Sequence, residues 1–317
     1  MKLKYSIIIP VYNRPVEVGE LLESLTLLKG DFYFEVVVVE DGSPNTSELI
    51  VKNFKKSLDI KYFLTENQGA GKSRNFGMQK ATGNYFIIFD SDCLIPCDYL
   101  IAVDEKLQLK YTDAFGGPDA AHSSFTNVQK AINYSMTSLI TTGGIRGKKK
   151  SVGKFQPRSF NLGISKKAFK KTQGFSDLKI GEDIDLTFRL WNLGFETQLI
   201  NNAFVYHKRR VDFNQFYKQT NAFGKARPIL NKRYPRTSKV TYWFPSLFLI
   251  GLFIAFLMSA FNQFYGLYIY GAYFLLLALL SSIENKNIRV GVLSIFSTGV
   301  QFCGYGLGFL TSYFSKK

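Results

Sequence analysis

The stretch NYFIIFDSDC, residues 84–93, joins an apolar run directly to two carboxylates that are separated only by Ser91. The run YFIIF has the length and the aromatic and β-branched content of a buried strand. Asp90 and Asp92 repel each other and lose hydration if partly buried, so such a pair persists where a cation or several hydrogen-bond donors compensate it. The pair is a candidate divalent-metal site, and a solvated acidic turn is the alternative.

The sequence before this strand alternates between strand-like and helix-like segments. The segments YSIIIPVYN, FEVVVVEDGSPN and IKYFLTENQG are of strand length, and VEVGELLESLTLLKG has apolar residues at helical spacing. A second glycine-punctuated helix is expected in GAGKSRNFGMQKATG, just before residue 84. This order predicts a mostly parallel sheet covered by helices, with ligands bound beyond the carboxyl ends of the strands. The endings PVYN, EDGS and DSD would therefore meet at one edge.

Two nucleotide-binding motifs are excluded by their spacing. The GKS at 71–73 resembles the end of a P-loop, but that motif needs a glycine five positions before Gly71, and Glu66 stands there. A dinucleotide fingerprint is absent because the first strand runs into PVYNRP rather than into a glycine-rich turn.

The C-terminal part is apolar enough to enter a membrane. No charged residue occurs from Val240 to Ile283 or from Val290 to Ser315, and these runs of 44 and 26 residues exceed the roughly 20 residues that a crossing helix needs. Asn262 and Gln263 interrupt the first run. We therefore expect a membrane domain at 240–315, with α-helices at about 242–261, 264–283 and 290–314. A buried hairpin in a soluble protein is the alternative, and GYGLG at 304–308 suggests close helix packing.

The charge distribution suggests an orientation in the membrane. The formal net charge is +16, and residues 208–239 carry ten Lys and Arg against one acid, Asp212. This interfacial segment fits the positive-inside rule and contact with the anionic inner leaflet of a cytoplasmic membrane. MKLKYSIIIPVYN has too short an apolar stretch for a secretory signal, so residues 1–235 are expected to be a cytoplasmic catalytic domain.

Two further observations concern the positive charge of the chain. With three crossings, the final SKK would lie outside, against the rule, and a re-entrant third segment would remove this conflict. No recognisable nucleic-acid module accompanies the basic charge, so nucleic acid is not an expected partner.

Four blocks in order resemble glycosyltransferase family 2, whose members are inverting enzymes of the GT-A fold. They are SIIIPVYNR, VVVVEDGS, NQGAGKSRNFGMQKATGNYFIIFDSDC and FNLGISKKAFKKTQGFSDLKIGEDIDLTFRLWNLGFETQLINNAFVYHKRR. The resemblance covers roughly residues 4–230 and implies a Rossmann-like α/β domain that binds a nucleotide sugar. The sequence departs from processive synthases of the same superfamily, because no QxxRW motif follows His207.

The resemblance also implies roles for single residues. Asp183 in the late GED block would be the catalytic base, and Asp90 and Asp92 would form the DxD metal motif for Mg²⁺ or Mn²⁺, with Asp90 closer to the ribose. His207 at the end of NAFVYH would be a further metal ligand, or else a structural hydrogen-bonding group. The residues expected to contact the nucleotide are Pro10, Tyr12, Asn13, Asp41, Arg74 and Asp90.

Some of these residues have ordinary structural explanations. Glu182 and Asp183 stand at the start of a helix, where acidic residues are common caps. Asp185 is a competing carboxylate that would lie elsewhere around the same helix. The basic stretch at 146–155 is either a loop that closes on donor phosphates or a solvated run of charge.

These observations lead to an expected activity. The chain is expected to be a membrane-anchored, inverting hexosyltransferase of polysaccharide biosynthesis that transfers a sugar from a nucleotide-sugar donor, UDP-linked, to a hydroxyl of a lipid-linked or growing envelope glycan. The alternatives are transfer onto a polyprenyl phosphate, nucleotidyl transfer and a non-catalytic membrane scaffold that binds nucleotide sugars.

Overall fold

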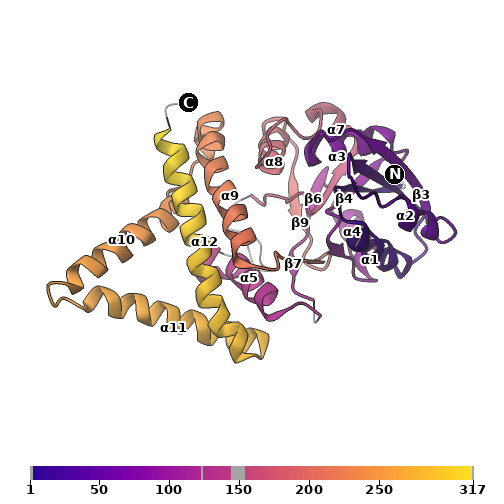
Figure 1. Ribbon diagram of the computed structural model, residues 1–317. Helices are drawn as coiled ribbons and strands as arrows, with labels where there is room; N and C mark the ends of the chain where they lie inside the picture. Colours follow the sequence, from indigo (N-terminus) through magenta and orange to yellow (C-terminus); the bar gives the residue numbers. More distant parts are fainter. Residues whose placement is uncertain (1–2, 123, 144–153, 316–317) are drawn as a thin grey trace. The chain divides into compact units, whose positions relative to one another are not determined.

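The computed structural model describes residues 3–122, 124–143 and 154–315, which form two compact units (Figure 1). The first unit comprises the described parts of Met1–Ala120 and Lys148–His207, and the second those of Ala121–Gly147 and Lys208–Lys317. Most of the basic stretch at 146–155 lies outside the described residues.

The first unit is built on a seven-stranded sheet in the order β3-β2-β1-β4-β8-β6-β9. The strands β3, β2, β1 and β4 run parallel, whereas β8 is antiparallel to both of its neighbours. The expected mostly parallel α/β sheet is confirmed. The strands are β1 (Tyr5–Val11), β2 (Phe34–Asp41), β3 (Asp59–Thr65), β4 (Tyr85–Phe89), β6 (Ala114–Gly116), β8 (Asn161–Ser165) and β9 (Thr197–Leu199).

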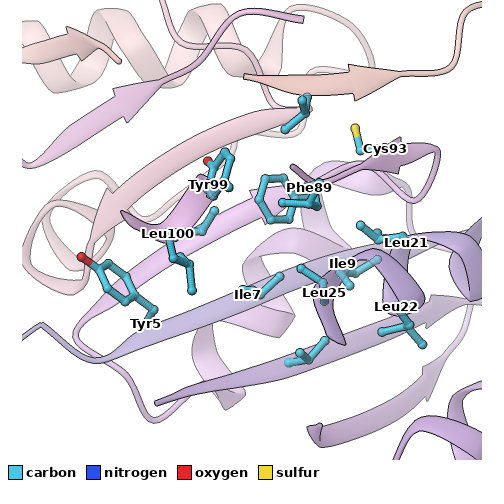
Figure 2. Packing of buried hydrophobic residues seen from close by; sticks show 14 of the residues in the cluster. Tyr5, Ile7, Ile9, Leu21, Leu22, Leu25, Phe89, Cys93, Tyr99 and Leu100 are labelled. Atoms are coloured by element: carbon cyan, nitrogen blue, oxygen red, sulfur yellow. The ribbon is translucent and has the colours of Figure 1, made fainter. Parts of the chain in front are cut away.

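Helices cover both faces of this sheet. Successive strand residues point to opposite sides, so the buried strands present apolar side chains on both faces. Ile7 and Ile9 of β1 pack in the cluster shown in Figure 2, whereas Ile8 packs in the cluster on the other face. The first cluster contains residues of α1 (Pro15–Thr26), α2 (Glu48–Phe54) and α4 (Tyr99–Leu109). The second contains residues of α3 (Ala70–Lys80), α7 (Lys166–Thr172) and α8 (Glu182–Asn192).

A small second sheet holds the segment after β4. It has the order β5-β10-β7, formed by β5 (Cys93–Leu94), β10 (Val205–His207) and β7 (Asp119–Ala120). In its register His207 pairs with Cys93, and Val205 pairs with Asp119. Three segments that are distant in sequence are thus held side by side next to the DSD turn.

The second unit is helical. Three of its helices are long and apolar enough to cross a membrane, at Val240–Ser259, Tyr265–Asn285 and Ile288–Phe314, close to the expected segments. Asn262 has φ +59 in the turn between the first two. The helices are α5 (Asn127–Thr137), α6 (Leu139–Thr142), α9 (Phe213–Arg233), α10 (Phe244–Ser259), α11 (Tyr265–Asn285) and α12 (Ile288–Phe314), with 3₁₀ turns at Pro235–Thr237 and Val240–Trp243.

The boundaries between the two units differ from the domain boundary at 235–240 that the sequence predicts. Helices α5 and α9 belong to the second unit, because both pack on α12. Composition does not reveal this grouping, since both helices are polar and the faces that meet them on α12 carry small residues.

Glu35 is a buried carboxylate at the amino-terminal end of β2. It accepts hydrogen bonds from Ser6 Oγ at 2.6 Å and from the backbone N–H of Thr82 at 2.6 Å, and its other oxygen lies 2.6 Å from Lys61 Nζ. Burial by itself would raise the pKa of Glu35, but these donors stabilise the ionised form and lower the pKa from 4.5 to about 2.

This shift predicts an acid-dependent stability. The contribution of Glu35 is fully present above its unfolded-state pKa of 4.5 and is lost as pH falls toward about 2. We expect Glu35→Gln to lower the thermal unfolding midpoint of the detergent-solubilised chain at pH 6, with less than half of that effect near pH 3. Glu105→Gln, at an exposed position on α4, is the matched control, and an equal effect of both variants would contradict the assignment.

Candidate active site

The carboxyl ends of the parallel strands bring several sequence-predicted residues to one edge of the first unit. Val11 of β1 is in register with Glu40 of β2, so the turns that follow the two strands are neighbours. Asn13 has φ +53 in the first turn, and its backbone N–H donates to Ser43 Oγ at 2.7 Å. This edge is where ligands bind in sheets of this type.

The two carboxylates that end β2 hold the surrounding backbone. Asp41 accepts the backbone N–H groups of Gln68 and Gly69, each at 2.9 Å, and thereby holds the loop before α3. Glu40 is fully buried and accepts hydrogen bonds from Ser43 and Ser47. Both residues therefore shape the expected nucleoside pocket, and direct contact of Asp41 with a nucleotide remains a prediction.

Pro10 and Tyr12 lie at the same strand end. Pro10 belongs to the buried strand β1, whereas the side chain of Tyr12 is 52% exposed and can contact a base or ribose. Their assignment to the nucleoside pocket also remains a prediction.

Arg74 of α3 connects the segment after β4 with the start of α8. Its Nη2 lies 2.7 Å from Asp90 Oδ1 and its Nη1 lies 2.9 Å from Glu182 Oε1. The guanidinium group is nearly inaccessible and lies over the ring of Phe175, 5.2 Å from the centroid. Burial opposes the positive charge, but the two carboxylates outweigh it and raise the pKa of Arg74. The DSD and GED blocks therefore lie at one site.

The start of α8 carries two adjacent carboxylates in different surroundings. Burial, followed by the neighbouring charge of Asp183, raises the pKa of Glu182 to about 7 although Arg74 opposes this shift. Asp183 Oδ1 accepts the backbone N–H of Ile184 at 2.8 Å, and its Oδ2 lies 3.6 Å from Arg158 Nη1. Both side chains are 14% exposed, so neither carboxylate is fully enclosed by protein.

Asp185 has a structural role in the described chain. Its side chain is 1% exposed and lies 2.8 Å from Arg189 Nε, one turn further along α8. Arg189 also donates to the backbone carbonyl oxygens of Thr172 and Gly174 at the end of α7. Asp185 therefore ties α8 to α7 rather than facing Asp90 and Arg74.

Asp92 lies in a second cluster of charged groups. Its Oδ2 is 2.7 Å from Arg14 Nη1, and its Oδ1 is 3.2 Å from His207 Nε2. The other imidazole nitrogen, Nδ1, is 3.8 Å from Asp119 Oδ2, and the ring stacks on Phe160 with the centroids 4.8 Å apart. The small sheet β5-β10-β7 fixes these distances, because it carries His207 and Asp119 on paired strands.

This second cluster has a donor set that fits Mg²⁺ or Mn²⁺. Donor atoms of Asp92, Cys93 and His207 lie within 4.8 Å of one another. Burial raises the pKa of the Cys93 thiol well above its ordinary value, which disfavours the thiolate that a metal would need. The oxygen of Asp92 and the nitrogen of His207 are therefore the better ligands, and phosphate oxygens and water would complete the shell. Asp90, held by Arg74, is not a member of this cluster.

Four polar residues of these clusters were not among the site residues predicted from the sequence. Glu182 and Arg14 stand directly beside residues that were identified, so adjacency was the available signal. Asp119 and Arg158 lie in the GGPD and QPRSF stretches, far in sequence from the residues they approach. Local sequence carries no signal for such long-range contacts.

Solved structures with a similar fold support the architectural assignment. A mannosyltransferase from Pyrobaculum calidifontis, solved with GDP-Man and Mn²⁺, aligns with a TM-score of 0.64 and 14% identity over 100% of this chain and 89% of that chain. Residues 1–349 of TarS from S. aureus align with a TM-score of 0.52 and 19% identity over 98% and 91% of the two chains. The fold is thus that of the GT-A-like glycosyltransferases.

The chain belongs to glycosyl transferase family 2, whose family model matches residues 6–172. A second model, glycosyl transferase family group 2, matches residues 159–283. An uncharacterized glycosyltransferase of Haemophilus influenzae is 29% identical over 242 residues, which are 73% of this chain and 77% of the relative. One of Rickettsia bellii is 38% identical over 144 residues, 45% of this chain and 20% of the relative. The chain spans a fifth or less of the length of the rickettsial relatives it matches.

The contrast between Asp183 and Asp185 gives a test of the site. Replacing Asp185 with Ala leaves Arg189 without its buried partner, a change that costs about 3–5 kcal/mol. We expect the thermal unfolding midpoint of the detergent-solubilised chain to fall by several degrees in Asp185→Ala and to stay within about one degree in Asp183→Asn. Asp177→Asn, whose carboxylate is 89% exposed, serves as the control. A larger loss of stability in Asp183→Asn than in Asp185→Ala would contradict these assignments.

Proposed function

We propose that this chain transfers a sugar from a nucleotide-sugar donor, UDP-linked, to a hydroxyl of a lipid-linked or growing cell-envelope glycan, with inversion at the anomeric carbon. The observation that carries the proposal is the position of Arg74 between Asp90 and Glu182. It supports a single site that contains both the donor-binding block and the acidic start of α8. Membership of glycosyl transferase family 2 supports the reaction class.

The donor would bind at the carboxyl ends of β1, β2 and β4. Pro10, Tyr12, Asn13 and Asp41 would surround the nucleoside, and Asp90 would approach the ribose. Arg74 would exchange part of its contact with Asp90 for the diphosphate, since a buried guanidinium forms strong charge-assisted hydrogen bonds with phosphate oxygens. The solved relatives that contain GDP-Man and UDP-GlcNAc agree with a nucleoside-diphosphate sugar as donor.

Asp92 and His207 would hold Mg²⁺ or Mn²⁺, with Asp90 as a further oxygen ligand if it leaves Arg74. The ion would supply Lewis-acid stabilisation of the charge that develops on the departing diphosphate. In this chain Arg14, 2.7 Å from Asp92, adds positive charge at the same place.

The transfer would be a single displacement. An acceptor hydroxyl oxygen forms the new bond to the anomeric carbon while the bond from that carbon to the diphosphate oxygen breaks. Asp183 accepts the hydroxyl proton, and the nucleoside diphosphate leaves with the electron pair of the broken bond. Arg158, whose Nη1 lies 3.6 Å from Asp183 Oδ2, would orient the Asp183 carboxylate.

The membrane helices and the basic segment before them support the location. The catalytic unit would lie on the cytoplasmic face of the cell membrane, with the Lys and Arg residues of 208–239 against its anionic inner leaflet. A glycan on a lipid carrier would reach the donor site from that surface.

Loss of the proposed base is the first test. Membranes that contain the full chain would be incubated with Mn²⁺, lipid extract and a panel of UDP- and GDP-sugars, and the labelled product identified. We expect Asp183→Asn to reduce the rate of transfer by about 10²–10⁴-fold while the affinity for the donor stays within about twofold. Asp177→Asn is the matched control and should transfer normally.

Other outcomes of this assay would change the proposal. Unchanged transfer in Asp183→Asn would argue for an acceptor that is already anionic, such as a polyprenyl phosphate. Release of pyrophosphate instead of nucleoside diphosphate would show nucleotidyl transfer. Donor binding with no product under any condition would favour a non-catalytic scaffold.

The metal assignment has its own measurement. We expect Asp92→Asn and His207→Ala each to weaken Mn²⁺ binding at least tenfold in the nucleotide-loaded chain, as followed by the electron paramagnetic resonance signal of free Mn²⁺. Cys93→Ser should bind Mn²⁺ with nearly unchanged affinity, because the thiol is buried and neutral. Equal losses in all three variants would contradict the choice of ligands.

A further inference from the structure

The three candidate membrane helices have different surroundings within the second unit. In the most apolar 18-residue stretch of each segment, only 17% of Val240–Ser259 and 11% of α11 is buried by protein, whereas 50% of α12 is buried. In Figure 1, α10 and α11 form a V whose open end meets α12, and α12 lies beside α9. This difference raises the question of whether all three helices cross the membrane.

The C-terminal half of α12 packs closely against α9. A Cβ atom on Gly304 would lie 2.1 Å from Thr220 Oγ1, and one on Gly308 would lie 2.3 Å from the backbone oxygen of Asn221. Further along both helices, Ser312 Oγ donates to the backbone oxygen of Lys225 at 2.8 Å. The two helices therefore run parallel with their backbones in close approach, and the packing role expected of GYGLG is found here.

The N-terminal half of α12 packs against α5 instead. Ser297 Oγ donates to the backbone oxygen of Ala131 at 3.0 Å. At the start of the helix, Asn287 Nδ2 donates to Asn127 Oδ1 at 3.3 Å. The polar helices α5 and α9 therefore pack against α12 over most of its length.

The charge on α9 prevents it from following α12 through a bilayer. It carries five Lys and Arg residues in 21 positions, Lys218, Lys225, Arg227, Lys232 and Arg233. Each such residue costs about 2.5–3.5 kcal/mol at the centre of a membrane helix. If α12 crossed the bilayer in this packing, it would carry α9 with it, and breaking the packing would expose the buried Ser, Thr and Gln side chains of α12 to lipid.

The remaining face of α12 is apolar and exposed. It presents the side chains of Ile288, Val292, Phe296, Leu307 and Phe314. This stripe lies opposite the face that contacts α5 and α9, which is the pattern of a helix that lies in the membrane interface.

Both ends of the α10–α11 hairpin meet α12. At the start of α10, Ser246 Oγ donates to the backbone oxygen of Gly306 at 3.1 Å, and the rings of Trp243 and Phe309 lie 4.8 Å apart. Toward the end of α11, Ser281 Oγ is 2.7 Å from Ser294 Oγ of α12. A helix that touches both ends of the hairpin lies across its base.

We propose that only α10 and α11 cross the membrane, as a hairpin, and that α12 lies along the membrane surface with its apolar stripe in the lipid. The C-terminus is then on the same side as α9 and the basic segment 208–239. Under this topology Lys286, Arg289 and the two final lysines all lie on the basic side, as the positive-inside rule requires. It removes the conflict that three crossings create, and it does not depend on the proposed enzymatic activity.

Thiol labelling of membrane vesicles tests this topology. Single cysteines would be placed at three exposed positions, Ser238→Cys before α10, Gln263→Cys in the hairpin turn and Ser315→Cys after α12, with Cys97 and Cys303 replaced by Ser. Cys93 remains because its thiol is buried. Right-side-out and inside-out vesicles would be treated with a membrane-impermeant maleimide, and the chain without an added cysteine measures background labelling.

The two orientations separate the possible outcomes. We expect positions 238 and 315 to be labelled from the same side and position 263 from the opposite side, with at least a tenfold preference in each case. Labelling of positions 263 and 315 from the same side, opposite to 238, would establish three crossings and overturn the proposal. Labelling of all three positions from one side would also overturn it, because the hairpin would then not cross.

A second variant tests the packing that underlies the topology. Gly308→Leu introduces a side chain where the backbone of Asn221 lies, so it should separate α12 from α9 and lower the thermal unfolding midpoint of the chain in detergent. Gly299→Leu is the matched control, since a Cβ atom at Gly299 meets nothing within 4 Å. Equal behaviour of the two variants would contradict the packing of α12 on α9.

Discussion

The candidate site depends on one buried cation, the guanidinium group of Arg74. Asp90 follows β4 and Glu182 begins α8, and the burial of Glu182 would be strongly unfavourable for its charged form without a positive partner. Arg74 compensates both at distances of 2.7 and 2.9 Å, and its own burial is possible only because both are present. Sheet, helix and turn are thus held together by the charges that the proposed chemistry requires.

A second arrangement of charge surrounds Asp92. The small sheet β5-β10-β7 holds His207 and Asp119 on paired strands, so the imidazole lies between two carboxylates while Arg14 approaches Asp92 from the other side. Two carboxylates separated by a single residue therefore have different partners. Asp90 is bound to a guanidinium group from α3, and Asp92 lies in a set of groups that suits a divalent cation.

In the second unit, α12 has two faces of different character. Glycine and serine on α12 allow α9 and α5 to approach its backbone, and this approach buries a polar face that the mean hydropathy of the helix conceals. The apolar character that makes α12 a candidate for crossing resides largely on its other face. Length and composition alone do not separate a crossing helix from one that lies along the surface.

The sequence by itself determined the alternation of strands and helices, the parallel part of the sheet and the three apolar helices. Each of these follows from local periodicity, from the ends of apolar runs and from the absence of charge, which act over a few neighbouring residues. The order of the motif blocks also identified Asp90, Asp92, Asp183 and His207 as candidates.

Only the tertiary structure decided which of these groups meet. Nothing near Arg74 in the sequence indicates Glu182, which is 108 positions away, and nothing near His207 indicates Asp119, because a contact between distant segments depends on strand order and helix packing. The different surroundings of Asp183 and Asp185 and the packing of α12 on α9 likewise depend on the tertiary structure. Local sequence specifies what each side chain can do, and the fold selects the partners among which it acts.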